Sequence, residues 1–205
     1  MPAIVAGRRG PRRADTPGSV PEVTRPADLI TAGRGVLVLV LAVVVLRGFV
    51  DGDAWDVGDG RAAWAWTVVA LAVPAWALDA LDGYVARRTG SVTDRGARLD
   101  SGVDGLLVLV LSVAVVPVAP WALVGGLLLP VFLAVQVVRP AWRRTLPPRP
   151  WRRIAGGTTT GTLVVGMAPV WPEVLVQVAV ALAVVLVTWS FAVDVRWLER
   201  QAVGA

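Results

Sequence analysis

The feature that most constrains this chain is an uncharged run of 34 residues, from Gly105 to Val138. A helix rises about 1.5 Å per residue, and ~20 apolar residues are enough to cross the hydrocarbon core of a bilayer. The run is therefore too long for one membrane helix. Pro117 and Pro120 divide it into two predicted helices with a tight turn between them.

Four further apolar segments are predicted to be membrane helices. They cover residues 29–50, 62–81, 154–171 and 174–193. Together with the two helices of the uncharged run they predict an all-α, polytopic membrane protein with six transmembrane helices. The composition agrees, because 56% of the residues are hydrophobic and only 17% are charged, less charge than a soluble domain usually carries.

The first 25 residues differ from the rest, since they are rich in Pro, Gly and Arg. They lack an apolar run followed by a small-residue cleavage site, so they do not resemble a signal peptide. We expect a flexible basic tail, for which contact with anionic headgroups would be favourable. The predicted organisation is a cytoplasmic tail (1–25), a membrane domain (26–200) and a short second tail (201–205).

The arginines predict the orientation. The chain has no lysine, and all of its twenty basic residues except Arg47 and Arg61 fall on one side of the predicted helices. By the positive-inside rule this side, with both termini, faces the cytoplasm. The lack of lysine and the abundance of Arg, Ala, Val and Gly are typical of a GC-rich bacterial genome, so we expect a bacterial cytoplasmic membrane. We expect no nucleic-acid partner.

Four aspartates do not fit a simple membrane protein. Asp79 and Asp82 are spaced i,i+3 at the end of one predicted helix, and Asp100 and Asp104 are spaced i,i+4 at the start of the next. Each spacing places both side chains on one helix face, so the four can meet at the cytoplasmic edge of the bilayer. Clustered carboxylates repel one another and are costly to desolvate, which predicts cations between them.

The composition limits which cations these are. The chain has no cysteine and no histidine, so a metal must be held by oxygen, which favours Mg²⁺, Mn²⁺ or Ca²⁺. Two such ions could clamp a diphosphate. Gly83 and Gly96 would let a ligand approach the backbone, and Arg87 offers a fork of donors to phosphate. Asp94, outside the pattern, is interpreted as a solvated helix end or cap.

This pattern resembles the signature of the CDP-alcohol phosphotransferases, a family of enzymes with six transmembrane helices. The resemblance covers residues 26–200, but its specific part is a 26-residue motif. Every specified position is filled at the right spacing: Asp79-x-x-Asp82-Gly83-x-x-Ala86-Arg87, eight residues, then Gly96-x-x-x-Asp100-x-x-x-Asp104.

The resemblance implies that a phosphatidyl group passes from a CDP-linked lipid, usually CDP-diacylglycerol, to an alcohol, with release of CMP. It implies two Mg²⁺ ions, or Mn²⁺, at the four aspartates, with Asp104 also the general base. It further implies a homodimer, and the GxxxG pair Gly157–Gly161 is a pattern that favours close helix packing. The implied nucleotide and diphosphate ligands are Gly83, Ala86, Arg87 and Gly96, with Asp28, Thr31 and Arg34 from a related stretch before the first helix.

The acceptor alcohol is less constrained. A basic cluster surrounds the connection between the fourth and fifth helices and would suit a phosphorylated acceptor such as glycerol 3-phosphate; alternatively it only sets orientation and contacts anionic lipid. Asp194 departs from the inositol-phosphate pattern of the family. The cluster consists of Arg139, Arg143, Arg144, Arg152 and Arg153, and the candidate acceptor ligands among them are Arg139, Arg143, Arg152 and Arg153.

Three other functions are open at this point. A non-catalytic relative would bind CDP-lipid without turnover. A cation or proton-coupled transporter would also need intramembrane carboxylates, although these lie near the membrane edge rather than at its midplane. A structural membrane protein would leave the four aspartates unexplained.

Overall fold

The computed structural model describes residues 26–56, 58–89, 94–139, 142 and 149–203. For residues 26–30, 80–89, 94–99, 150 and 202–203 it describes the backbone alone. This part of the chain contains helices and no strand, as predicted. The elements are α1 (Pro26–Asp51), the short 3₁₀ helix η1 (Asp53–Trp55), α2 (Asp59–Thr89), α3 (Asp94–Ala114), α4 (Ala122–Val138), α5 (Pro150–Gly166) and α6 (Glu173–Val203).

The six predicted helices are all present, and the break predicted in the uncharged run is confirmed. α3 ends at Ala114 and α4 begins at Ala122, on either side of the two prolines. Some ends differ from the prediction. α2 continues through the polar residues after the apolar segment to Thr89. α5 ends at Gly166, three residues before Pro169, which disfavours helix at Ala168.

Three helices of the described chain are long and apolar enough to cross a membrane: Thr31–Asp51, Asp59–Asp79 and Glu173–Gln201. Helix α4 is apolar but shorter, and the first part of α3 carries charged residues. Large apolar side chains point outward along the helices, including Leu46 and Val185, which are 64% and 67% exposed. Such a surface is suited to lipid and not to water.

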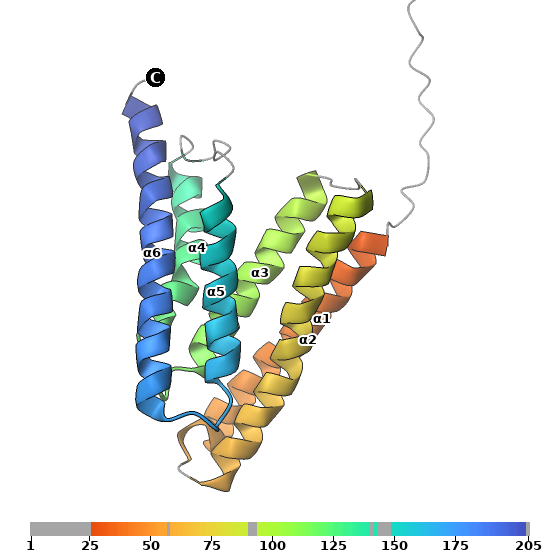
Figure 1. Ribbon diagram of the computed structural model, residues 1–205, viewed down its shortest axis with the longest axis vertical. Coiled ribbons are helices and arrows are strands. Elements are labelled where there is room, and N and C mark those ends of the chain that lie inside the picture. Colours follow the sequence, from red (N-terminus) through yellow and green to blue (C-terminus); the bar gives the residue numbers. More distant parts are fainter. Residues whose placement is uncertain (1–25, 57, 90–93, 140–141, 143–148, 204–205) are drawn as a thin grey trace, which may run out of the picture.

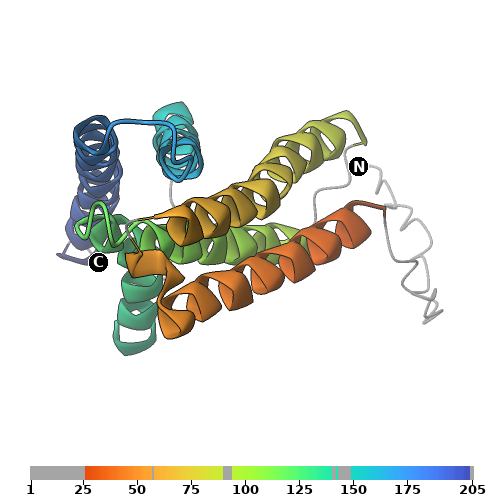
Figure 2. The same cartoon turned by 90° about the horizontal axis from the view of Figure 1, so that it is seen from below.

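The helices form two groups that meet along α3. Helices α1, α2 and α3 pack together, and α4 and α5 both contact α6. Contacts of α3 with α4 and α5 connect the groups, which are tilted relative to each other (Figure 1). The view from below shows α1, α2 and α3 running side by side (Figure 2). The start of α1, the end of α2, the start of α3 and the end of α6 lie at one end of the molecule (Figure 1).

Small residues allow the closest helix contacts. A Cβ atom on Gly48 of α1 would collide with the indole of Trp64, which donates a hydrogen bond of 3.2 Å to the carbonyl oxygen of Val44. A Cβ atom on Gly126 of α4 would lie 2.7 Å from the Cβ of Ser112 in α3. These contacts hold α1 against α2 and α3 against α4.

Candidate metal and active site

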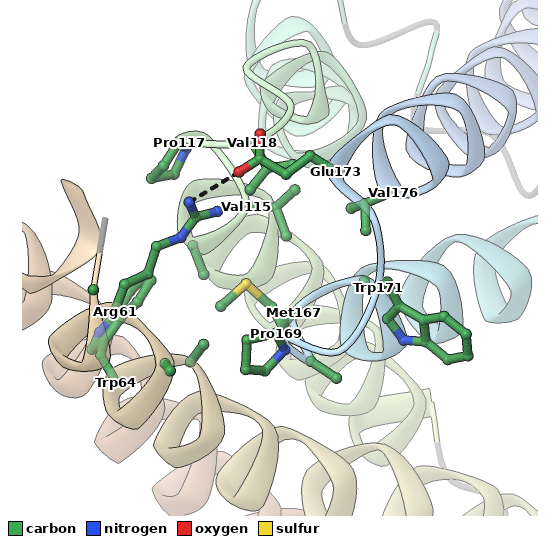
Figure 3. A pocket seen from close by; sticks show the side chains of 16 residues that line it. Arg61, Trp64, Val115, Pro117, Val118, Met167, Pro169, Trp171, Glu173 and Val176 are labelled. Atoms are coloured by element: carbon green, nitrogen blue, oxygen red, sulfur yellow. Dashed lines mark hydrogen bonds and ion pairs between the residues drawn. The ribbon is translucent and has the colours of Figure 1, made fainter. Parts of the chain in front are cut away.

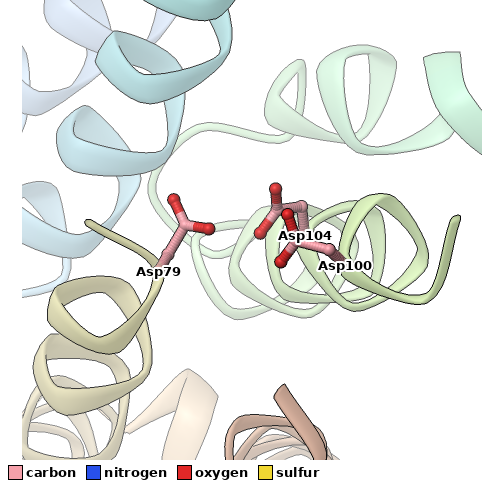
Figure 4. Close-up of side chains that lie close together, drawn as sticks. All are labelled: Asp79, Asp100 and Asp104. Atoms are coloured by element: carbon pink, nitrogen blue, oxygen red, sulfur yellow. The ribbon is translucent and has the colours of Figure 1, made fainter. Parts of the chain in front are cut away.

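Three of the four predicted aspartates come together. Asp79 in α2 and Asp100 and Asp104 in α3 each offer a carboxylate oxygen, and these oxygens all lie within 4.8 Å of one another. Figure 4 shows Asp79 facing Asp100 and Asp104 across the space between the two helices. The spacing of Asp100 and Asp104 puts both on the α3 face toward α2, and the contacts of α1 with α2 and α3 hold the helices in this register.

A buried arginine lies among these carboxylates. The side chain of Arg34, from α1, is completely buried. Its Nη1 contacts Asp79 Oδ1 at 2.5 Å, and its Nη2 contacts Asp100 Oδ1 at 2.9 Å and Asp104 Oδ1 at 2.6 Å. Nη2 also donates to the backbone oxygen of Asp100 at 3.2 Å. One guanidinium therefore joins three helices.

The site concentrates negative charge at the edge of the apolar region. Asp79 is the last residue of one candidate membrane span, and Asp104 directly precedes the uncharged run. Burial raises the pKa of the Asp104 carboxyl to about 7; Arg34 acts in the opposite direction, and Asp79 and Asp100 add to the rise.

The donor set fits a hard divalent cation. Carboxylate oxygens are the ligands that Mg²⁺ and Mn²⁺ prefer, and the three side chains are still 38%, 41% and 46% exposed, so a ligand can reach them. The guanidinium of Arg34 occupies a place where positive charge is stabilised. Helices α2 and α3 thus supply the carboxylate oxygens that an oxygen-ligated metal site requires.

The remaining predicted ligands have known places in the backbone. Thr31 lies one turn before Arg34 in α1. Asp82, Gly83, Ala86 and Arg87 follow Asp79 in α2, Gly96 precedes Asp100 in α3, and Asp28 lies near the start of α1. The side chains of these last residues fall outside the described residues, so their part in the site stays a prediction.

The predicted acceptor arginines are tied to acidic residues of α6. Arg152 in α5 contacts Asp194 through Nε at 2.8 Å and through Nη2 at 3.0 Å, and Asp194 is only 5% exposed. Arg139 contacts Glu199 at 2.6 Å. Arg153 is exposed on α5, and the structure does not describe Arg143 or Arg144.

Asp194 was not predicted to be the partner of Arg152. The available signal was an acidic residue in the apolar sixth segment, because an ionisable group at membrane depth requires a partner. The pairing itself joins positions 42 residues apart in the sequence, which no local pattern indicates.

A cavity of about 250 Å³ lies at the opposite end of the helices from the aspartates. It is lined by residues such as Trp64, Met167 and Trp171, and Arg61 contacts Glu173 at its rim at 3.2 Å (Figure 3). Arg61 and Asp79 are separated by 18 residues of α2, about 27 Å at the usual helical rise. This cavity is therefore not part of the carboxylate site.

Fold and site together define a helical membrane protein with a carboxylate centre suited to a divalent cation. Comparison with protein families identifies which one: the family model for CDP-alcohol phosphatidyltransferase matches residues 25–190, so the chain belongs to this family. A comparison with curated proteins returned no match. The match spans α1 to most of α6, and thus includes all three clustered aspartates and Arg34.

The resemblance inferred from the motif is confirmed by this match. The family carries out phosphatidyl transfer from a CDP-alcohol, which places the chain among the transferases of phospholipid synthesis.

Proposed function

We propose that this protein transfers a phosphatidyl group from CDP-diacylglycerol to a small alcohol and releases CMP. The observation that carries the proposal is the convergence of Asp79, Asp100 and Asp104 within 4.8 Å at the end of apolar helices, in a chain of the CDP-alcohol phosphatidyltransferase family. Nothing in the described residues favours a transporter, since Asp79 ends its span instead of lying at mid-depth.

In this proposal the four aspartates hold Mg²⁺, two ions in all, with Mn²⁺ as an alternative. When bound, the metal would neutralise the diphosphate and stabilise negative charge that develops during transfer. Gly83, Ala86, Arg87 and Gly96, with Asp28 and Thr31, would contact the nucleotide and diphosphate. Arg34 was also predicted to contact the nucleotide. Because it contacts Asp79 and Asp104, it would order the carboxylates of the metal site as well.

The reaction needs a base because an alcohol is a poor nucleophile at neutral pH. Asp104 would accept the hydroxyl proton while the alcohol oxygen forms a bond to the β-phosphorus. The bond between that phosphorus and the bridging oxygen breaks, and the electron pair leaves with CMP. The lipid tails would stay beside the outward apolar side chains of the helices, while the headgroup and acceptor meet at the carboxylates.

We infer that the acceptor is phosphorylated, with glycerol 3-phosphate as the first candidate. Arg152 supports this, because its two contacts with buried Asp194 hold the guanidinium in one orientation, and a guanidinium that is already ordered loses less entropy when it binds phosphate. Exposed Arg153 would add to the anion site, as would Arg139 and Arg143, which the sequence places between the fourth and fifth helices.

The proposal extends to the arrangement in the membrane. All six helices would span, with both termini and the active site on the cytoplasmic side of a bacterial membrane. Residues 26–200 would form the catalytic domain between the two tails, and the protein would be a homodimer. The distribution of arginines supports the orientation.

The test is to supply detergent-purified protein with labelled CDP-diacylglycerol, Mg²⁺ and a panel of alcohols, and to identify the lipid product. We expect CMP release with glycerol 3-phosphate and little with unphosphorylated alcohols. Product from inositol, serine or another alcohol alone would refute the acceptor assignment. Tight binding of CDP-diacylglycerol with no CMP from any acceptor would favour the non-catalytic relative.

A further inference from the structure

The carboxylate cluster contains a cation of its own. Arg34 reaches it from α1 and contacts one oxygen of each of the three aspartates. Its side chain is fully buried, whereas the aspartates remain partly exposed. The arginine therefore approaches from the protein interior, and a ligand can approach only from the exposed side.

This arrangement solves a problem that the aspartates create. Three carboxylates in such close proximity repel one another when no cation lies between them. A guanidinium keeps its charge at any ordinary pH and donates in several directions at once, so one side chain can offset the repulsion across α1, α2 and α3. In return, the carboxylates compensate a buried charge that would otherwise be very costly.

The same contacts oppose metal binding. A divalent cation held by these aspartates would bind carboxylates that already accept from Arg34 through Oδ1 of Asp79 and Asp104. Two cations at neighbouring positions also repel each other, and this repulsion is strong where water is partly excluded. The arginine thus favours the assembled site without metal and disfavours its occupation.

We propose that Arg34 is the resident counter-cation of the carboxylate site: it keeps the three aspartates assembled without metal, and it competes with divalent metal for their oxygens. This inference rests on the metal site of the proposed function. Arg34 is a positioning residue here, because it acts through the aspartates and not on the reacting atoms.

The experiment measures Mn²⁺ binding to the full-length, detergent-purified protein by electron paramagnetic resonance, and thermal unfolding in EDTA and in Mn²⁺. Wild type is compared with Arg34→Gln, Arg34→Lys and the control Arg61→Gln, which removes an arginine from the distant Glu173 pair. We expect Arg34→Gln to unfold at lower temperature in EDTA, to gain more from Mn²⁺, and to bind Mn²⁺ about tenfold more tightly. Arg34→Lys should be intermediate, and Arg61→Gln should bind Mn²⁺ like wild type.

Mn²⁺ binding by Arg34→Gln that is equal to or weaker than wild type would overturn the competition, and unchanged stability in EDTA would overturn the assembly role. If Arg34→Gln can be purified only with Mn²⁺ present, the inference is supported. If Arg34→Gln cannot be purified at all, the test is the Mn²⁺ affinity of Arg34→Lys. An affinity of Arg34→Lys for Mn²⁺ that is no tighter than that of wild type overturns the inference. Absence of Mn²⁺ binding by wild type overturns both this inference and the metal centre, whereas bound Mn²⁺ without CMP release overturns the proposed reaction alone.

Discussion

Replacing Asp194 by Ala should destabilise the protein and also weaken acceptor binding. Asp194 is 5% exposed and makes contacts of 2.8 and 3.0 Å with Arg152. Removing one partner of a buried ion pair costs about 3–5 kcal/mol. Because the Arg152 side chain is 34% exposed, water can solvate it after the change, and we discount the cost to about 2–3 kcal/mol. That corresponds to a fall of about 5–10 °C in Tm for a chain of this size.

The assay is thermal unfolding in detergent, with Glu199→Ala as the matched control. Glu199, also in α6, pairs with Arg139 at the end of α4 and accepts a hydrogen bond from the indole of Trp142. The Glu199 and Arg139 side chains are 40% and 61% exposed, so the loss of Glu199 should cost only about 1 kcal/mol. KM for glycerol 3-phosphate should rise in Asp194→Ala because Arg152 loses its fixed orientation. Equal stabilities of the two variants would refute the argument that burial makes the Arg152 pair the stronger one.

Three further predictions concern packing, metal and acceptor. Gly126→Ala should lower the free energy of unfolding by about 1–3 kcal/mol, because its Cβ would lie 2.7 Å from Ser112 and 3.2 Å from the Cα of Leu109. The control Gly157→Ala, whose Cβ would meet nothing within 4 Å, should leave the protein equally or more stable. Equal unfolding temperatures of the two variants would contradict this prediction. Treatment with EDTA should abolish CMP release, and Mg²⁺ or Mn²⁺ should restore it; activity that persists in EDTA would exclude a metal-dependent reaction. Arg153→Ala should raise KM for glycerol 3-phosphate about tenfold with little change in KM for CDP-diacylglycerol, and a change in neither would remove Arg153 from the acceptor site.

The helices could be predicted from the sequence because their signal is local. Apolar runs and two prolines were enough to place α3 and α4 on either side of a turn. The spacings within Asp79-x-x-Asp82 and Asp100-x-x-x-Asp104 likewise predicted shared helix faces, and the meeting of Asp79 with Asp100 and Asp104 is confirmed. Of the six helices predicted to span the membrane, three meet the criterion of length and hydropathy within the described residues.

The contacts of the buried charges could not be predicted. Arg34 interrupts an apolar segment, which indicates that it has a partner, but its partners lie 45 to 70 residues further along the chain. Which carboxylate it meets depends on the packing of three helices. The pairing of Arg152 with Asp194 depends in the same way on the packing of α5 against α6.

The most direct test of the central claim is the rate of CMP release by Asp104→Asn at saturating Mg²⁺, CDP-diacylglycerol and acceptor. Asparagine keeps the size of the side chain but can neither accept the hydroxyl proton nor carry the charge that a metal needs. Asp53→Asn is the matched control, because Asp53 is exposed in η1, outside the carboxylate cluster. The account predicts that Asp104→Asn remains folded and loses about 10²-fold or more in rate, while Asp53→Asn keeps the wild-type rate. Folded Asp104→Asn protein that releases CMP at the wild-type rate would contradict the account.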